Sequence, residues 1–161
     1  MKTRMLIVVV GALALVSAGA YAAKTKLFEF PEAGFKLTWQ KGVKIKQHTG
    51  NKDLIFEGAR GPVKLKVIVR KGERLPEAQH EFRLMSYFAG HWTRAEADCR
   101  GAGWDGCSSW NWDSESGDRA GVGEVGYGPG GTYIFVLSAP ESSFKQHRPK
   151  MRLVQQSVQL F

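Results

Sequence analysis

The sequence lacks the motifs that mark common enzyme active sites. It has no Gly-x-Ser-x-Gly motif, no phosphate-binding glycine loop after a strand and no His-Glu-x-x-His motif. Its four histidines, at positions 48, 80, 91 and 147, are scattered along the chain. We therefore expect a non-catalytic protein without cofactor or metal, and an enzyme whose site forms only in three dimensions is the alternative.

Long apolar runs are also absent, except for one at the start of the chain. Residues 5–16 are apolar, Lys2 and Arg4 precede them, and Ala20-Tyr21-Ala22 has the small-x-small pattern of a cleavage site. This order is typical of a secretory signal peptide. We predict that residues 1–22 are a signal peptide and that residues 23–161 are one exported domain, periplasmic or secreted. An uncleaved membrane anchor is the alternative.

Cysteine is scarce, with only Cys99 and Cys107, which flank a glycine-rich loop. In an exported chain such a pair predicts a disulfide bond, which stabilises by about 2.6 kcal/mol for a loop of this size. A redox pair and half of a zinc site are the alternatives. Redox pairs usually have two intervening residues, and a zinc site needs further ligands in register.

Alternation of apolar and polar residues predicts short antiparallel strands in the first half of the chain. The predicted strands cover residues 34–40, 43–48, 53–58 and 63–70. Further on, residues 107–113 and 119–127 predict a strand pair in which Trp110 and Trp112 cover Gly121 and Gly123. A calcium loop between these two strands fits poorly, because its glycine is misplaced.

Helical spacing follows Gly72, where Ala78, Phe82, Met85 and either Phe88 or Ala89 are predicted to form the apolar face of an amphipathic helix. Near the end of the chain, residues 132–137 are an unbroken short run of β-branched, aromatic and aliphatic residues, which predicts a central strand buried on both faces. Ser138 and Glu141 have capping-box spacing, which predicts a helix start, and a second helix is expected after Pro149. Its apolar stripe, which should lie on the sheet, comprises Met151, Val154, Val158 and Phe161.

This order of elements resembles the PsbP-like family. The resemblance is carried by Phe30-Pro31-x-x-Gly34-Phe35, by Leu75-Pro76-Glu77-Ala78, and by Tyr133-x-Phe135 with Phe144, Pro149, Val154 and Ser157. The family includes periplasmic DcrB-like proteins, the PsbP subunits of photosystem II and a nuclear-import factor that binds Ran. The resemblance implies an α+β fold, an antiparallel sheet meander between helices in an α/β/α sandwich, and a non-catalytic accessory or binding role. The Cys99–Cys107 loop departs from the family pattern.

Acidic residues are fewer than basic ones, 15 against 23, for a net charge of +8. Six basic residues in the early strands are predicted to share one sheet face: Lys36, Lys44, Lys46, Lys64, Lys66 and Arg70. Such a face suits an anionic partner. The candidates are an envelope polymer, an acidic protein and, through peripheral membrane contact, lipid headgroups. Nucleic acid suits an exported protein poorly. A merely solvated face, on which lysines discourage edge-to-edge aggregation, is the alternative.

The sequence thus predicts an exported accessory or binding protein of the cell envelope, with two alternatives. A periplasmic enzyme would be favoured if a cleft gathered His48, His80 or His91 beside a serine or carboxylate. A structural subunit of an envelope complex would be favoured by an exposed apolar patch around Trp92 and Trp104.

Signal-peptide cleavage is directly testable by the intact mass of the exported protein. We expect a mass that corresponds to loss of residues 1–22 or 1–23, because the basic start, apolar run and small-x-small end occur in order. A membrane-bound product that retains residues 1–22 would contradict the prediction.

Overall fold

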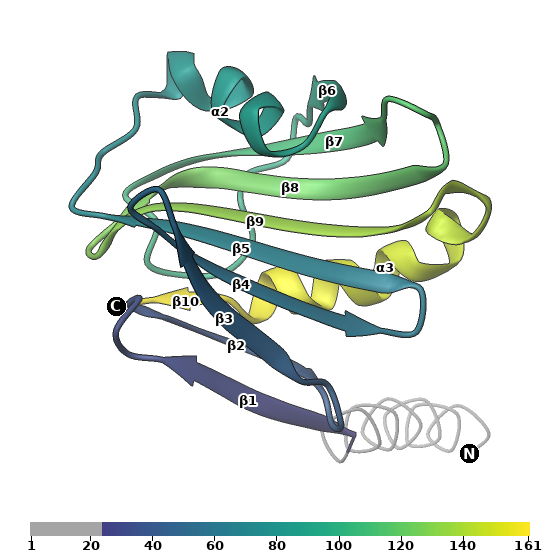
Figure 1. The fold of residues 1–161 in the computed structure, drawn as a ribbon, viewed down its shortest axis with the longest axis horizontal. Helices are drawn as coiled ribbons and strands as arrows, with labels where there is room; N and C mark the ends of the chain where they lie inside the picture. Colours follow the sequence, from purple (N-terminus) through teal and green to yellow (C-terminus); the bar gives the residue numbers. More distant parts are fainter. Residues whose placement is uncertain (1–23) are drawn as a thin grey trace, which may run out of the picture.

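The computed structural model describes residues 24–161, and the predicted signal peptide lies outside this range. Seven strands form an antiparallel sheet in the order β3-β4-β5-β9-β8-β7-β6, and three form a smaller sheet in the order β1-β2-β10 (Figure 1). The strands are β1 Thr25–Phe30, β2 Phe35–Gln40, β3 Ile45–Gly50, β4 Asp53–Arg60, β5 Val63–Lys71, β6 Gly90–Arg94, β7 Gly106–Ser114, β8 Arg119–Gly128, β9 Gly131–Pro140 and β10 Gln159–Leu160. The helical elements are η1 Glu77–Gln79, α2 His80–Tyr87 and α3 Glu141–Ser157.

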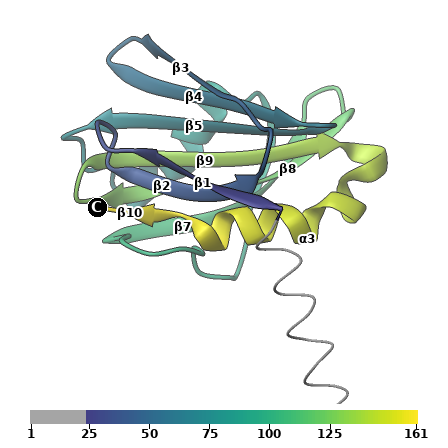
Figure 2. The same cartoon turned by 90° about the horizontal axis from the view of Figure 1, so that it is seen from below.

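The large sheet is the middle of three layers. One face packs against α2, and the opposite face packs against α3 and the small sheet, which lie nearest the viewer in Figure 2. The predicted α+β fold with an antiparallel sheet between helices is confirmed. The small sheet contributes Phe35, Leu37 and Trp39 of β2 to the core, all less than 5% exposed.

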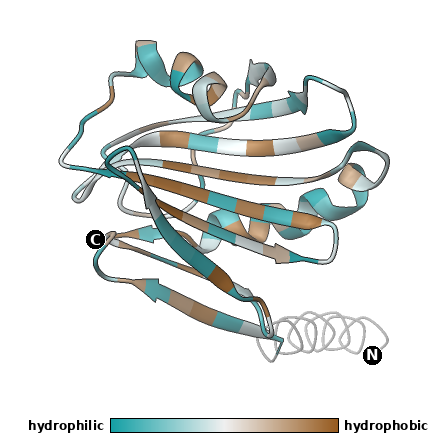
Figure 3. Ribbon diagram, in the orientation of Figure 1, coloured by the Kyte–Doolittle hydropathy of each residue, from teal (hydrophilic) through white to brown (hydrophobic). Residues whose placement is uncertain are grey.

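Strand β9 is central, as its apolar sequence predicts. It lies fourth of seven strands, and every residue from Gly131 to Ala139 is buried. Tyr133, Phe135 and Leu137 point to the core shared with α3, whereas Ile134 and Val136 belong to the core under α2. Its neighbour β5 shows the expected alternation of hydrophobic and hydrophilic residues (Figure 3).

The end of the chain forms one helix rather than the predicted two. Ser138 does not start a helix, because β9 continues to Pro140, which pairs with Arg119 of β8. Pro149 lies inside α3 and does not restart it. A proline inside a helix costs about 3 kcal/mol. Burial of Met151 and Val154 against the sheet compensates for this cost.

Helix α2 is rotated relative to the prediction. Phe82 is 77% exposed and Met85 51% exposed, whereas His80 and Leu84 are buried. Two polar contacts hold this rotation. His80 Nδ1 lies 2.6 Å from Ser108 Oγ, and the Tyr87 hydroxyl donates to the Asp53 carboxylate. These tertiary hydrogen bonds outweigh the apolar stripe on the other side of the helix.

The tryptophans cover the glycines of β8 largely as expected. A Cβ at Gly121 would lie 3.1 Å from the ring of Trp112, and one at Gly123 would lie 2.8 Å from the ring of Trp92. Trp92 rather than Trp110 therefore makes the second contact. Only residues without side chains allow these rings to lie so close to the sheet.

The rotation of α2 predicts opposite outcomes for two substitutions on one helix. Leu84→Ala should lower the free energy of unfolding by about 2–5 kcal/mol, because Leu84 is fully buried. Phe82→Ala should change it by less than about 0.5 kcal/mol, because that ring is exposed. Urea denaturation followed by circular dichroism measures both. A larger loss for Phe82→Ala than for Leu84→Ala would contradict the observed rotation.

Candidate functional site

Four of the six predicted basic residues line one open groove of about 630 Å³. The lysine groove, as we call it, crosses β3, β4 and β5 on the side of the sheet that carries α2. It is lined by Lys44, Lys46, Lys64, Lys66, Glu57, Phe88, Val136 and Ser138, with Gly42, Gly58, Ala59 and Leu65. The four lysines and single glutamate give the lining a net charge of +3.

The other two predicted residues lie outside this groove. Lys36 is not on the predicted shared face, whereas Arg70 is on the same face of the large sheet as Lys64 and Lys66. Lys36 is on β2, in the small sheet, where its ammonium lies 5.9 Å from the Phe161 ring centroid. The prediction assumed that the early strands form one sheet, but β1 and β2 pair with β10 instead. Arg70 is at the far end of β5 and is bound to acidic residues.

Arg70 belongs to a structural ion-pair network. Its guanidinium donates to both carboxylate oxygens of Asp53, at 2.7 and 3.1 Å, and lies 3.7 Å from Glu73. Asp53 is 2% exposed and also accepts from Tyr87. Burial, followed by the hydrogen bond to Asp53, raises the pKa of Tyr87 to about 12. The charge of Arg70 is thus compensated within the protein. Asp53 of β4, which also binds Tyr87 of α2, anchors α2 to β4.

Strand register divides the groove into two rows of side chains. In the first row Glu57 of β4 pairs with Lys46 on one side and Lys66 on the other. In the second row Ala59 of β4 pairs with Lys64, and Lys44 immediately precedes β3 on the opposite side. Adjacent strands are about 4.8 Å apart, so the backbone positions of Lys46 and Lys66, which flank Glu57, are about 10 Å apart.

The two rows differ in how their lysines are neutralised. The Lys66 ammonium lies 3.2 Å from the Glu57 carboxylate. Within residues 24–161, no carboxylate forms an ion pair with Lys44 or Lys64. Between them the exposed methyl group of Ala59 leaves open the place that a carboxylate occupies in the neighbouring row. The second row therefore has room and charge for an external anion.

Where the groove meets β9 and the end of α2, Ser138 adds a hydroxyl and Phe88 adds an aromatic ring. Ser138 pairs with Lys64, and its hydroxyl accepts a hydrogen bond from Arg119 at 3.1 Å. The Lys66 ammonium lies 5.7 Å from the ring centroid of Phe88. The sequence analysis did not identify Ala59 and Ser138 as residues of this site. Only their pairing with Lys64 in the sheet places them there.

A serine and a histidine do lie together, and the histidine, His80, lines an open recess of about 290 Å³ beside Glu77 and Cys107. His80 is 1% and Ser108 3% exposed. Ser108 Oγ accepts from Trp110 Nε1 at 2.7 Å and donates to His80 Nδ1, so Nε2–H of His80 faces the Leu75 carbonyl. Burial lowers the pKa of His80 and favours the neutral ring. Ser108 does not line this recess and is almost fully buried, and the hydrogen bond between the two side chains joins α2 to β7.

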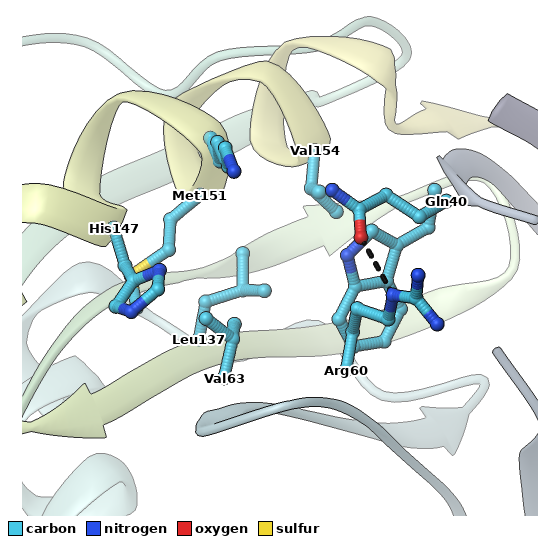
Figure 4. Close-up of a pocket in the computed structure, with 9 residues that line it drawn as sticks. Gln40, Arg60, Val63, Leu137, His147, Met151 and Val154 are labelled. Carbon is cyan, nitrogen blue, oxygen red and sulfur yellow. Dashed lines mark hydrogen bonds between the residues drawn. The ribbon is translucent and has the colours of Figure 1, made fainter. Parts of the chain in front are cut away.

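A small, partly open space lies between α3 and the sheets (Figure 4). Its volume is about 70 Å³, and Leu137, Met151 and Val154 line it together with the Gln40–Arg60 hydrogen bond of 2.9 Å. This volume is well below the roughly 300–1,000 Å³ of typical small-molecule sites. Across the described residues, no cluster of metal-ligating side chains is present. None of the helices in that part of the chain is long and apolar enough to cross a membrane.

The predicted Cys99–Cys107 disulfide is present, with Cα atoms 6.0 Å apart. The loop that it closes packs back on the chain terminus, where Ala102 bridges to Gln159. Trp92 is 4% exposed and Trp104 half-buried, so these two residues do not form the exposed apolar patch that would favour a structural subunit. A disulfide is consistent with an extracytoplasmic protein.

Glu124 is the most deeply buried carboxyl group of the described chain. It is 0% exposed, and its Oε1 accepts from the backbone N–H of Arg100 at 2.6 Å. Its Oε2 has no hydrogen-bond partner among residues 24–161. Burial, only partly offset by Arg100, raises the pKa of Glu124 from its ordinary 4.5 to about 8. The side chain is therefore mostly protonated at neutral pH.

Comparison with solved structures supports the fold at low sequence identity. The solution structure of cyanobacterial PsbP (CyanoP) from Synechocystis sp. PCC 6803 matches with a TM-score of 0.57 and 14% identity, over 86% of this chain and 94% of that one. A protein from Bacteroides thetaiotaomicron matches with a TM-score of 0.49 and 14% identity, over 86% of this chain and 49% of that one. No family model and no curated protein matches the sequence. The chain thus has a PsbP-like fold.

Glu124 makes stability depend on pH in a defined direction. Between pH 4.5 and 8 the folded state keeps the proton that the unfolded state has lost, so stability falls as pH rises. One proton contributes a slope of about 1.4 kcal/mol per pH unit. Denaturation at several pH values in this range measures how the free energy of unfolding depends on pH. Glu124→Gln should remove the slope, and Glu32→Gln, a control at an exposed site, should retain it. Identical slopes in all three proteins would contradict the buried, protonated state.

Proposed function

We propose that this protein of PsbP-like fold is a non-catalytic accessory protein of the cell envelope that binds an acidic segment of a partner protein. The proposal is carried by the row in which Ala59 lies between Lys44 and Lys64. In the neighbouring row a carboxylate of the chain itself, Glu57, lies beside Lys66 at 3.2 Å. A partner carboxylate at Ala59 would make the equivalent contact. Lys64 and Lys44 would otherwise remain mutually repulsive.

The shape of the groove favours a chain segment over a flat membrane. The lysines line a recess, whereas a lipid surface is met best by protruding side chains. Phe88 and Val136 add apolar surface inside the recess, which suits a peptide that carries both acidic and apolar residues. Export to the periplasm or the exterior is part of the proposal, supported by the signal-peptide pattern and the disulfide.

Ala59 provides the sharpest test. Ala59→Glu places a carboxylate between Lys44 and Lys64 and should weaken binding of an oligoglutamate peptide about tenfold. Ala59→Gln, which has the same size without the charge, should weaken binding much less. Fluorescence anisotropy with a labelled peptide at low salt measures both, and wild-type affinity should fall as salt is raised.

A second pair of variants separates the groove from general basicity. Lys44→Gln with Lys64→Gln should reduce binding strongly. The charge-matched control, Lys26→Gln with Lys71→Gln, removes two lysines outside the groove and should not. Equal binding by wild type and Ala59→Glu, or no salt-dependent binding by wild type, would overturn the proposal. Binding to phosphatidylglycerol vesicles without peptide binding would replace the acidic protein by a lipid surface.

A second candidate function, a subunit of an envelope complex, is supported by the outer face of α2. An apolar stripe of four exposed residues follows this face through η1 and α2 and past the helix end: Ala78, Phe82, Met85 and Ala89. This spacing is that of a helix that docks its apolar side in a groove of another protein. Glu77 and Glu81 flank the stripe, so a groove with a basic rim would fit it best.

A further inference from the structure

A second cluster of basic side chains lies on the opposite side of the molecule from the lysine groove. An open recess of about 370 Å³ beside α3 is lined by Arg100, Lys145, Arg148, Pro149, Arg152, Leu153 and Gln156. Four of these seven residues are cationic and none is acidic. Helix α3 packs on the face of the large sheet that α2 does not cover, so the two basic sites are separate.

Local sequence and one tertiary contact bring the four charges together. Lys145, Arg148 and Arg152 have i, i+3 and i+7 spacing, which places them on one face of α3. Arg100 comes from the disulfide loop, held by the hydrogen bond from its backbone N–H to Glu124. The sequence analysis passed over this cluster, although the helical spacing of its three members on α3 was a usable signal.

The protein itself does not neutralise the cluster. None of the four side chains forms an ion pair within residues 24–161. Repulsion, first from Arg148 and more weakly from Arg100, lowers the pKa of Arg152. Glu124 contacts Arg100 through the backbone N–H and forms no ion pair with its guanidinium. The folded state therefore holds several like charges together without a counter-ion of its own.

Arg148 is held in place and keeps an unused donor. Its Nη2 donates to Asn111 Oδ1 at 3.4 Å, and its guanidinium lies 6.0 Å from the Phe144 ring centroid. Its Nε–H is buried without a hydrogen-bond partner in the described structure.

We propose that this recess, the arginine recess, binds a phosphomonoester group. Planar guanidinium groups match the oxygens of a phosphate in pairs, and three arginines converge here. A phosphomonoester carries up to two negative charges at neutral pH, more than a carboxylate offers. The volume is at the lower end of small-molecule sites, which suits a headgroup or a small phosphate compound. The source is a free phosphate or the headgroup of a lipid such as phosphatidic acid.

Binding of inorganic phosphate by isothermal titration calorimetry tests the site, with phosphatidic acid vesicles as a second probe. Arg152→Gln is the informative variant, because Arg152 is exposed and its replacement relieves repulsion. It should weaken phosphate binding about tenfold or more, the loss of one charge-assisted contact. Lys150→Gln is the matched control, since Lys150 is on the same helix but lines the small cavity of Figure 4.

Four outcomes decide the proposal. Phosphate binding that Arg152→Gln weakens and Lys150→Gln preserves supports it, with a free phosphate as the ligand. The same pattern with phosphatidic acid vesicles alone supports a lipid headgroup as the ligand. Binding of neither probe by wild type, or equal binding by wild type and Arg152→Gln, overturns it. Lys44→Gln with Lys64→Gln should leave phosphate binding unchanged, so failure of the lysine groove is distinguishable from failure of this site.

Discussion

The burial of β9 on both faces is the constraint on which the rest of the structure depends. A strand with apolar side chains on both sides can be stable in water only if a layer of structure covers each face. Here α3 and the small sheet cover Tyr133, Phe135 and Leu137, and α2 covers Ile134 and Val136. The three-layer arrangement is the consequence, and every candidate site lies where one of these covering layers ends.

The covering layers differ in extent, which explains the position of the lysine groove. On the side of α3 the small sheet extends the cover over β4 and β5, whose residues there are Phe56, Val67 and Val69. On the side of α2 the cover is one short helix, and β3, β4 and the first half of β5 remain open. Lysines occupy the open part because it faces water. Because α2 covers only part of this face of the sheet, the uncovered part needs polar side chains and also forms a recess.

Buried polar groups orient the covering elements rather than perform chemistry. His80 and Asp53 hold the rotation of α2 through Ser108 and Tyr87, and Glu124 holds the disulfide loop through the backbone of Arg100. Each group is nearly inaccessible to solvent, so each contributes to specificity of packing. The charges free to meet a partner are instead in the two exposed basic sites, on opposite sides of the sheet.

The sequence by itself determined most strands, the central place of β9, the disulfide and the PsbP-like fold. Alternation and uninterrupted apolar runs are local patterns. The residues of a strand therefore predict by themselves which of its faces are buried. Tertiary structure alone decided that β2 leaves the large sheet, that α2 turns Phe82 outward, and that α3 runs through Pro149. It also decided that Ala59 lies between Lys44 and Lys64. These features depend on register and on hydrogen bonds between residues far apart in the chain, and no local pattern encodes which strand lies beside which.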